Sequence, residues 1–150
     1  MQEQIDNFEC SCLLDNPILH NLPVDYTYGE ESFGTFFYKF YGEMDWNSAK
    51  STCEQDGAAL LVPKSIEENN FFAFVEHSGL NVKIWLGIND IDTEGEFVDS
   101  KGNPITFQNW NVGEPNNFRD EDAVEILSHN GKWNDDSVND QAIALCVFYP

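Results

Sequence analysis

The residues of this chain that are best suited to do chemistry are hard oxygen donors, and they gather in one segment. A calcium ion takes about six to eight oxygen ligands of this kind. A plain run of acidic residues is usually a solvated face, but carboxylates crowded into one loop repel one another, and a cation would offset that cost. The carboxylates of this segment are Asp90, Asp92, Glu94, Glu96, Asp99, Glu114, Asp120, Glu121, Asp122, Glu125, Asp135, Asp136 and Asp140.

Two short motifs in this segment pair a carboxylate with an amide. Glu114-Pro115-Asn116 places the two groups on either side of a proline, and if the peptide bond before Pro115 is cis, both side chains point the same way. Trp133-Asn134-Asp135 places an amide and a carboxylate next to each other on an expected strand. Each of these side chains can give one oxygen to a metal and still bond to a sugar hydroxyl. The pairing therefore suits a sugar site.

Two segments that precede these motifs are expected to be helices. Asp45 is suited to cap the first helix and Gly57 to end it. One face of that helix holds Trp46, Ala49, Lys50 and Cys53. Ser65 and Glu68 form a capping box that begins the second helix, and Gly79 ends it. We expect this second helix to bury a stripe of Phe71, Phe74 and Val75.

The remaining segments favour strands around a long loop. Alternation and aromatic content predict a strand over residues 34–41, and apolar runs predict strands over 84–88, 123–127 and 142–149. The chain from Asn89 to about residue 117 has no sustained period, which is acceptable in a compact domain when the loop is functional or held by metal. Residues 1–32 are acidic and irregular and read as an arm. The order of elements indicates an α+β fold.

Composition narrows the classes of function. The 150-residue chain carries 27 acidic and 7 basic residues, so its net charge is −20. Its length suits one domain, and 41% hydrophobic with 14% aromatic residues argues against disorder. The charge argues against sequence-independent binding to nucleic acid and makes an anionic membrane surface a poor partner, because both favour a basic protein surface. No transmembrane segment is expected, and no signal peptide is recognisable, which leaves a cytosolic protein or a mature chain without its leader.

The four cysteines favour the second of these alternatives. Cys53 and Cys146 are far apart, and Cys10 and Cys12 lie in the arm, so the spacing does not match a zinc site. A long-range bridge from Cys53 to Cys146 would suit an oxidising compartment. We therefore expect an extracellular, secreted protein.

These motifs together resemble the C-type lectin-like domain family over about residues 34–149. The resemblance rests on WNSAKSTC, IWLGIND, EPN at 114–116, WND at 133–135 and the final Cys146. EPN followed by WND after a WLG strand is specific, whereas EPN alone would mean little. The resemblance implies two helices, small antiparallel sheets and a long calcium-binding loop region, with an arm at 1–32 and a carbohydrate-recognition domain at 33–150.

The resemblance also implies two calcium ions. The ion that binds sugar, which two adjacent sugar hydroxyls also ligate, would be held by Glu114, Asn116, Glu121, Asn134 and Asp135. The second ion would brace the loop, held by Asp90, Glu94, Asn117, Asp122 and the shared Glu121.

The EPN pattern, rather than QPD, is associated in this family with mannose, glucose, N-acetylglucosamine and fucose, so glycans that end in mannose-type sugars are the implied partners. Phe118 and Arg119 follow this motif. Contact with the bound sugar and simple exposure to solvent both remain open for these two residues.

Two disulfides of the family are missing. The inner bridge would link the positions of Ala123 and Val138, and the N-terminal bridge has no cysteine near residues 34–38. We therefore expect the segment that carries Asn134 and Asp135 to be tied to the rest of the site mainly through calcium, and residues 112–138 to be mobile without it. For Cys10 and Cys12, intermolecular pairing into a homo-oligomer is favoured over a link between the two or free thiols.

Two other classes of function compete with a lectin. Carboxylate pairs can hydrolyse glycosides, but a carboxylate bound to calcium is a poor proton donor, and no G-x-S-x-G, HExxH or Gly-rich phosphate motif is present. We therefore expect no enzyme. The alternative is a calcium-stabilised domain of the same fold that binds a protein ligand rather than sugar, although such members usually lose the EPN and WND side chains.

Overall fold

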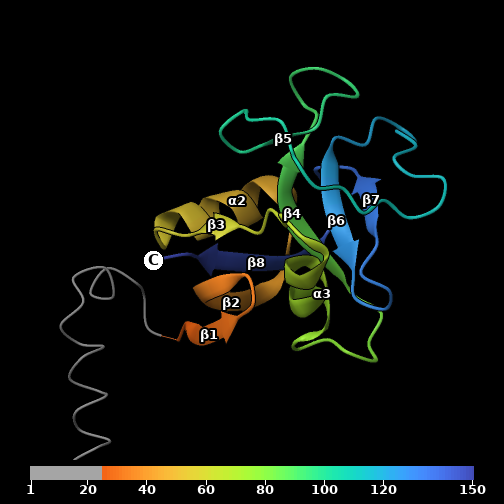
Figure 1. Cartoon of the computed structure of the whole chain (residues 1–150). Helices are drawn as coiled ribbons and strands as arrows, with labels where there is room; N and C mark the ends of the chain where they lie inside the picture. Colours follow the sequence, from red (N-terminus) through yellow and green to blue (C-terminus); the bar gives the residue numbers. More distant parts are fainter. Residues whose placement is uncertain (1–24) are drawn as a thin grey trace, which may run out of the picture.

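A computed structural model describes residues 25–150 as one sheet flanked by two helices (Figure 1). The helices are α2 (Trp46–Gln55) and α3 (Ile66–Phe74). The strands are β1 (Thr27–Glu31), β2 (Gly34–Met44), β3 (Ala59–Leu60), β4 (Lys83–Asn89), β5 (Val98–Asp99), β6 (Ala123–Leu127), β7 (Trp133–Asp136) and β8 (Ala142–Phe148). The α+β class is confirmed. Neither helix of residues 25–150 is long and apolar enough to cross a membrane.

The strands belong to one connected sheet with the order β1-β2-β8-β4-β6-β7. Strand β3 pairs with β8, and β5 pairs with β4. The pairs are antiparallel except β4 with β8, which is parallel. The expectation of several small sheets is therefore wrong, because the buried strand β4 joins the half that carries β2 and β8 to the half that carries β6 and β7.

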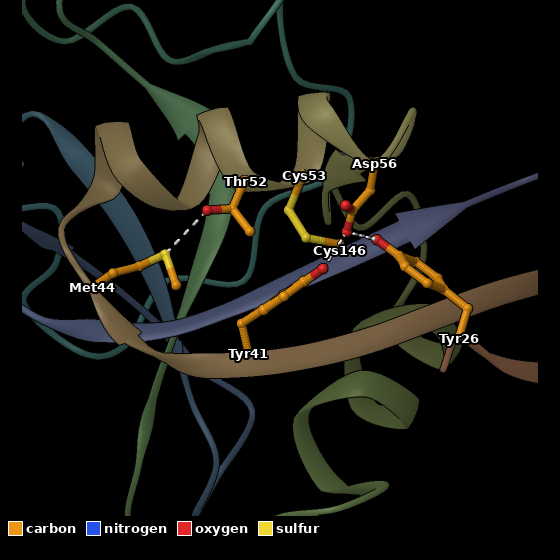
Figure 2. The surroundings of a disulfide bond; sticks show 7 residues. All are labelled: Tyr26, Tyr41, Met44, Thr52, Cys53, Asp56 and Cys146. Atoms are coloured by element: carbon orange, nitrogen blue, oxygen red, sulfur yellow. Dashed lines mark hydrogen bonds between the residues drawn. A yellow bond between two sulfur atoms is a disulfide. The ribbon is translucent and has the colours of Figure 1, made fainter. Parts of the chain in front are cut away.

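Helix α2 is capped at its N-terminal end and joined to the sheet near its C-terminal end. Asp45 caps its first turn by accepting from the backbone N–H of Ser48 at 2.8 Å. Near its other end, Cys53 forms a disulfide with Cys146 of β8, as Figure 2 shows. Both sulfurs belong to fully buried residues. The expected bridge is therefore confirmed.

A carboxylate beside this disulfide joins α2 to the first two strands. Asp56, at the end of α2, accepts from the hydroxyl of Tyr26 at 2.8 Å and from the hydroxyl of Tyr41 of β2 (Figure 2). The contact with Asp56, followed by burial, raises the pKa of Tyr41 to about 12, so this hydroxyl remains a donor at neutral pH. Tyr26 directly precedes β1, so this bond fixes the beginning of the described chain beside the end of α2.

Strand β1 corrects the expectation that residues 1–32 are irregular. Residues 27–31 pair with β2 in an antiparallel register from Thr27 opposite Tyr38 to Glu31 opposite Gly34. The side chains of β1 are mostly exposed, so the strand has no hydrophobic alternation in its sequence. Backbone pairing with β2 holds it instead. Residues 1–24, which include Cys10 and Cys12, lie outside the described part of the chain, and their expected role stays a prediction.

Helix α3 buries a different face from the one expected. Ser65 caps it through the N–H of Glu68, as the capping box predicts. However, Phe72 and Ala73 are fully buried, Phe71 and Phe74 only partly, and Val75 is exposed. The predicted buried stripe of α3 is wrong because the helix also buries a polar residue, which hydrophobic periodicity does not indicate.

That polar residue is Asn69, which connects α3 to the start of β7. Its Oδ1 accepts from the indole Nε1 of Trp133 at 2.7 Å, and its Nδ2 donates to the carbonyl of Gly131 at 2.8 Å. Both bonds are buried, and Asn69 and Trp133 are fully inaccessible. A buried amide that has both groups satisfied is stable in a core. Asn69 therefore sets the position from which β7 begins.

An apolar cluster holds both positions of the missing inner disulfide. Ala123, at the start of β6, is fully buried in a cluster with Trp46, Trp85 and the disulfide, and Val138 packs against the same cluster. The carbonyl of Val138 also accepts from the backbone N–H of Trp46 at 3.1 Å. The two positions therefore meet one cluster without a covalent link.

We predict that Ala123→Cys with Val138→Cys forms this bridge, in a background that carries Cys10→Ser and Cys12→Ser. The new disulfide would close a loop of ~15 residues, for which chain entropy predicts a gain of about 3 kcal/mol in the free energy of unfolding. Urea unfolding of the double variant, compared with each single cysteine variant, measures the gain. Two free thiols in the folded double variant would show that the positions do not meet.

Candidate metal centre

Three carboxylates converge where β4 ends and β6 begins. Oxygens of Asp90, Glu94 and Asp122 all lie within 4.8 Å of one another. The backbone N–H of Asp90 donates to the carbonyl of Asp122 at 3.1 Å, which joins the two strand ends. Asp90 Oδ2 also accepts from the N–H of Gly95 at 2.9 Å, and this bond folds the loop that carries Glu94 back toward the sheet. The structure therefore brings together three of the residues predicted for the bracing calcium.

These three carboxylates repel one another. The pKa of Glu94 is raised by desolvation and by the charges of Asp90 and Asp122. The pKa of Asp122 is raised by burial and by the charges of Asp120 and Asp90. Carboxylates whose pKa values are raised by neighbouring like charges, as those of Glu94 and Asp122 are, are stabilised by a cation, because the cation favours their ionised form.

A second group forms where the EPN loop meets β7. The Glu114–Pro115 bond is cis, and the side chains on either side of the proline meet: Asn116 Nδ2 donates to Glu114 Oε1 at 3.0 Å. Asp135, which is 1% exposed, accepts from the backbone N–H groups of Asn116 at 3.0 Å and Asn117 at 2.7 Å. The structure therefore joins the two motifs that the sequence placed 19 positions apart.

Glu121 and Asn117 close the loop between the two groups. Asn117 Oδ1 accepts from the N–H of Glu121 at 3.0 Å, and Glu121 Oε1 accepts from the N–H of Phe118 at 2.9 Å. The pKa of Glu121 is raised by burial and then by the charge of Asp135. Glu121 thus faces the second group while its neighbour Asp122 faces the first, and the two groups adjoin through these adjacent residues.

The remaining predicted ligand, Asn134, is hydrogen-bonded to a residue outside the predicted set. Its Nδ2 donates to Glu125 Oε1 at 2.9 Å, and Glu125 is fully buried opposite it on β6. Glu125 is a residue of the site that sequence reasoning missed. Glu125 could have been found only from the register of β6 with β7, which places residues 125 and 134 opposite each other. Composition does not reveal this register.

The donor set fits calcium in one further respect. Among residues 25–150, four buried polar side-chain atoms have no hydrogen-bond partner, and two of them are carboxylate oxygens of predicted ligands: Asp90 Oδ1 and Glu114 Oε2. One unpartnered oxygen thus lies in each group. Hard oxygens left without a donor are the ligands that calcium requires.

Phe118 and Arg119 lie at the surface of the same loop. The ring of Phe118 is 62% exposed, and the guanidinium of Arg119 lies 5.0 Å from its centroid. Asn117, Arg119 and Asp120 all have positive φ values, between 51° and 66°. Such a backbone costs energy for residues other than glycine and persists where surrounding bonds hold it, as the bonds around Glu121 do here.

The expectation that the segment of Asn134 and Asp135 is tied to the rest of the site mainly through calcium is wrong. Strands β6 and β7 form a regular antiparallel ladder from Ala123 opposite Asp136 to Ile126 opposite Trp133. Backbone pairing therefore fixes residues 133–136, and the bond from Trp46 fixes Val138. The stretch from about residue 112 to 122 has no such ladder, and contacts between carboxylate or amide side chains and loop N–H groups contribute much of what holds it.

The family model described as the Lectin C-type domain matches residues 42–148, and the chain belongs to this family. Its members are non-enzymatic carbohydrate-binding domains, so the glycoside hydrolase alternative is not supported.

Individual relatives agree with this assignment. CD209 antigen of Symphalangus syndactylus is 37% identical over 116 residues, which is 75% of this chain and 30% of that relative. The chain thus spans less than a third of the length of that protein. The cow carbohydrate-recognition domain of CD23, solved in the presence of a GlcNAc2Man3 oligosaccharide, has a TM-score of 0.71 and 30% identity over 85% of this chain and 95% of that domain.

The fold alone does not establish a metal site. A calcium-independent type II antifreeze protein has a TM-score of 0.70 and 18% identity, over 84% of this chain and 92% of that one. The side chains of the two acidic groups, rather than the fold, must therefore carry any argument about calcium.

We predict that calcium affinity falls as the pH is lowered below about 7. Burial, the adjoining Asp135 and the charge of Glu121 raise the pKa of Glu114 from 4.5 to about 7. Below this pH the metal-free protein holds a proton there that calcium must displace, which weakens binding by up to about tenfold per pH unit for each proton released. Calcium titrations at pH 8, 7, 6 and 5.5 measure the effect. Equal affinity at pH 8 and pH 5.5 would contradict this prediction.

We predict that calcium removal opens residues 112–122 and leaves β7 protected. Trypsin provides an internal control, because Arg119 lies in the loop whereas Lys132 directly precedes β7 and donates to Asn109 at 3.1 Å. Cleavage after Arg119 is expected to accelerate in EGTA, while Lys132 resists in both conditions. Mass spectrometry maps the cuts, and casein digested in parallel corrects for effects on the protease. Equal cutting after Arg119 with and without calcium would refute the prediction.

Proposed function

We propose that this chain is a calcium-dependent lectin domain that binds terminal mannose-type sugars, namely mannose, N-acetylglucosamine and fucose. The observation that carries the proposal is the meeting of Glu114, Asn116 and Asp135 in one hydrogen-bonded group with an unpartnered carboxylate oxygen. The presence of GlcNAc2Man3 in the crystal structure of the cow CD23 domain supports a sugar of this class.

The residues of the site have different roles in sugar binding. Bound calcium supplies coordination positions for two adjacent hydroxyls of the sugar. Glu114 and Glu121 offer carboxylate oxygens that accept from these hydroxyls, whereas Asn116 and Asn134 offer N–H groups that donate to them. Asp135 holds the backbone of the EPN loop against β7, so that the donors and acceptors keep their spacing.

The bracing group has a different role in this proposal. Asp90, Glu94 and Asp122 bind a second calcium ion together with Asn117 and the shared Glu121. Because Glu121 and Asp122 are neighbours in the chain, an ion held by Asp122 restrains the residue that faces the sugar site. The second ion therefore lowers the freedom of the loop before sugar binds.

We further propose that the protein acts outside the cell as a multivalent binder. The buried disulfide between Cys53 and Cys146 supports an oxidising compartment. A single shallow sugar site binds weakly, and linked sites raise avidity without any new contact. Cys10 and Cys12 of the arm are available in the sequence for such a link between copies of the chain.

We predict that Glu114→Gln with Asn116→Asp shifts retention from mannose-agarose to galactose-agarose. The exchange reverses which of the two groups donates and which accepts, and each position keeps an oxygen for calcium. The wild-type protein is expected to bind mannose-agarose in calcium and to elute with EDTA. Chromatography on both resins measures the shift.

Two outcomes of this experiment count against the proposal. Failure of the folded, calcium-loaded wild-type protein to bind either resin would favour a protein ligand instead of sugar. Unchanged preference for mannose in a double variant that still binds calcium would show that Glu114 and Asn116 do not set the specificity.

A further inference from the structure

The buried carboxylate Glu125 lies directly opposite Asn134 in the β6–β7 ladder. Residues opposite each other on antiparallel strands project from the same face of the sheet. Glu125 is 0% exposed, and its Oε1 accepts from Asn134 Nδ2 at 2.9 Å. A carboxylate is rarely placed so deep in a sheet unless neighbouring groups stabilise it.

A lysine stabilises this carboxylate and defines the role of the oxygen that faces Asn134. The ammonium of Lys83, on β4, lies 3.5 Å from Glu125 Oε1 and 3.1 Å from Asp136 Oδ2. An oxygen that faces an ammonium group accepts hydrogen bonds. Glu125 Oε1 therefore can only accept from Asn134, and this holds whatever the other oxygen of the carboxylate does.

This contact removes an ambiguity that an asparagine otherwise has. The oxygen and nitrogen of a side-chain amide are nearly equal in size, so a free asparagine can present either atom in a given direction. Glu125 repels Oδ1 of Asn134 and accepts from Nδ2. The amide is thereby held with its nitrogen toward β6 and its oxygen directed away from it.

We propose that Glu125, with Lys83, is a positioning residue that fixes the orientation of the Asn134 amide so that Oδ1 is available to calcium. The inference deepens the proposed function and rests on it. One N–H of Nδ2 is bound to Glu125, and the second remains for a sugar hydroxyl. The pair thus prepares Asn134 for both of its roles before either ligand arrives.

The test compares Glu125→Met, which keeps the length of the side chain and removes the acceptor, with Glu125→Gln, which keeps an acceptor. In the calcium-free protein, nitrogen-15 NMR of the Asn134 side-chain amide is expected to show one downfield, exchange-protected proton. Glu125→Met is expected to lose this signature and to weaken calcium binding by about tenfold or more, the range typical when a partner of a metal ligand is removed. Glu125→Gln is expected to restore most of both.

A matched control separates positioning from loss of stability. Glu68 is likewise a buried carboxylate, 4% exposed, but within residues 25–150 its side chain accepts hydrogen bonds from the backbone N–H of Lys64 and the hydroxyl of Tyr149, neither of which belongs to the site. Glu68→Met is expected to lower stability and leave the Asn134 amide and the calcium affinity within about twofold of wild type.

An unchanged Asn134 amide in calcium-free Glu125→Met would overturn the proposal, and so would a calcium affinity within twofold of wild type while Asn134→Ala loses binding. The amide signature needs neither calcium nor sugar. A wild-type protein that shows the signature but binds no calcium would therefore refute the proposed function and leave the contact between Glu125 and Asn134 intact.

Discussion

Repulsion among carboxylates is the constraint on which the rest of this structure depends. Charges that would separate in a free chain are kept a few ångströms apart, and the groups that hold them are mainly backbone amides: Gly95 on Asp90, Asn116 and Asn117 on Asp135, and Phe118 on Glu121. Hydrogen bonds from N–H groups to carboxylates are among the stronger ones in proteins. They shape the loop before any cation is present, and they leave selected oxygens free.

The site has a rigid half and a compliant half. Asn134 and Asp135 lie on β7, which pairs with β6, and Asp90 directly follows the paired strand β4. The starting point of β7 is set by the buried bonds of Asn69. The EPN loop and the residues up to Asp122 have no such ladder. A cation that bridges the halves gains from the fixed geometry of one and orders the other, so the ordering cost falls on few residues.

Most of the framework was predictable because it follows local rules. The cap at Asp45, the capping box at Ser65, the alternation over 34–41 and the WND strand all produced the expected elements. Three features depended on contacts between distant segments. Asn69 displaced the buried stripe of α3, β1 formed by pairing alone, and Glu125 reached Asn134 through strand register. Hydrophobic periodicity does not report partners of this kind. The tie of β7 to β6 was missed for the same reason.

Ala123 and Val138 pack against an apolar cluster where the family has its inner disulfide. As a result, the described disulfide and the proposed calcium ligands lie on different elements of the domain. In the described part of the chain, the disulfide from Cys53 to Cys146 joins α2 to β8, whereas the proposed ligands are all carboxylates and amides on β7 and in the loops. Thiol exchange therefore has no sulfur to attack inside the ligand shell. Under the proposed function, proton and calcium concentrations act on the binding face directly, whereas oxidants and reductants act on its described residues through the stability of the domain.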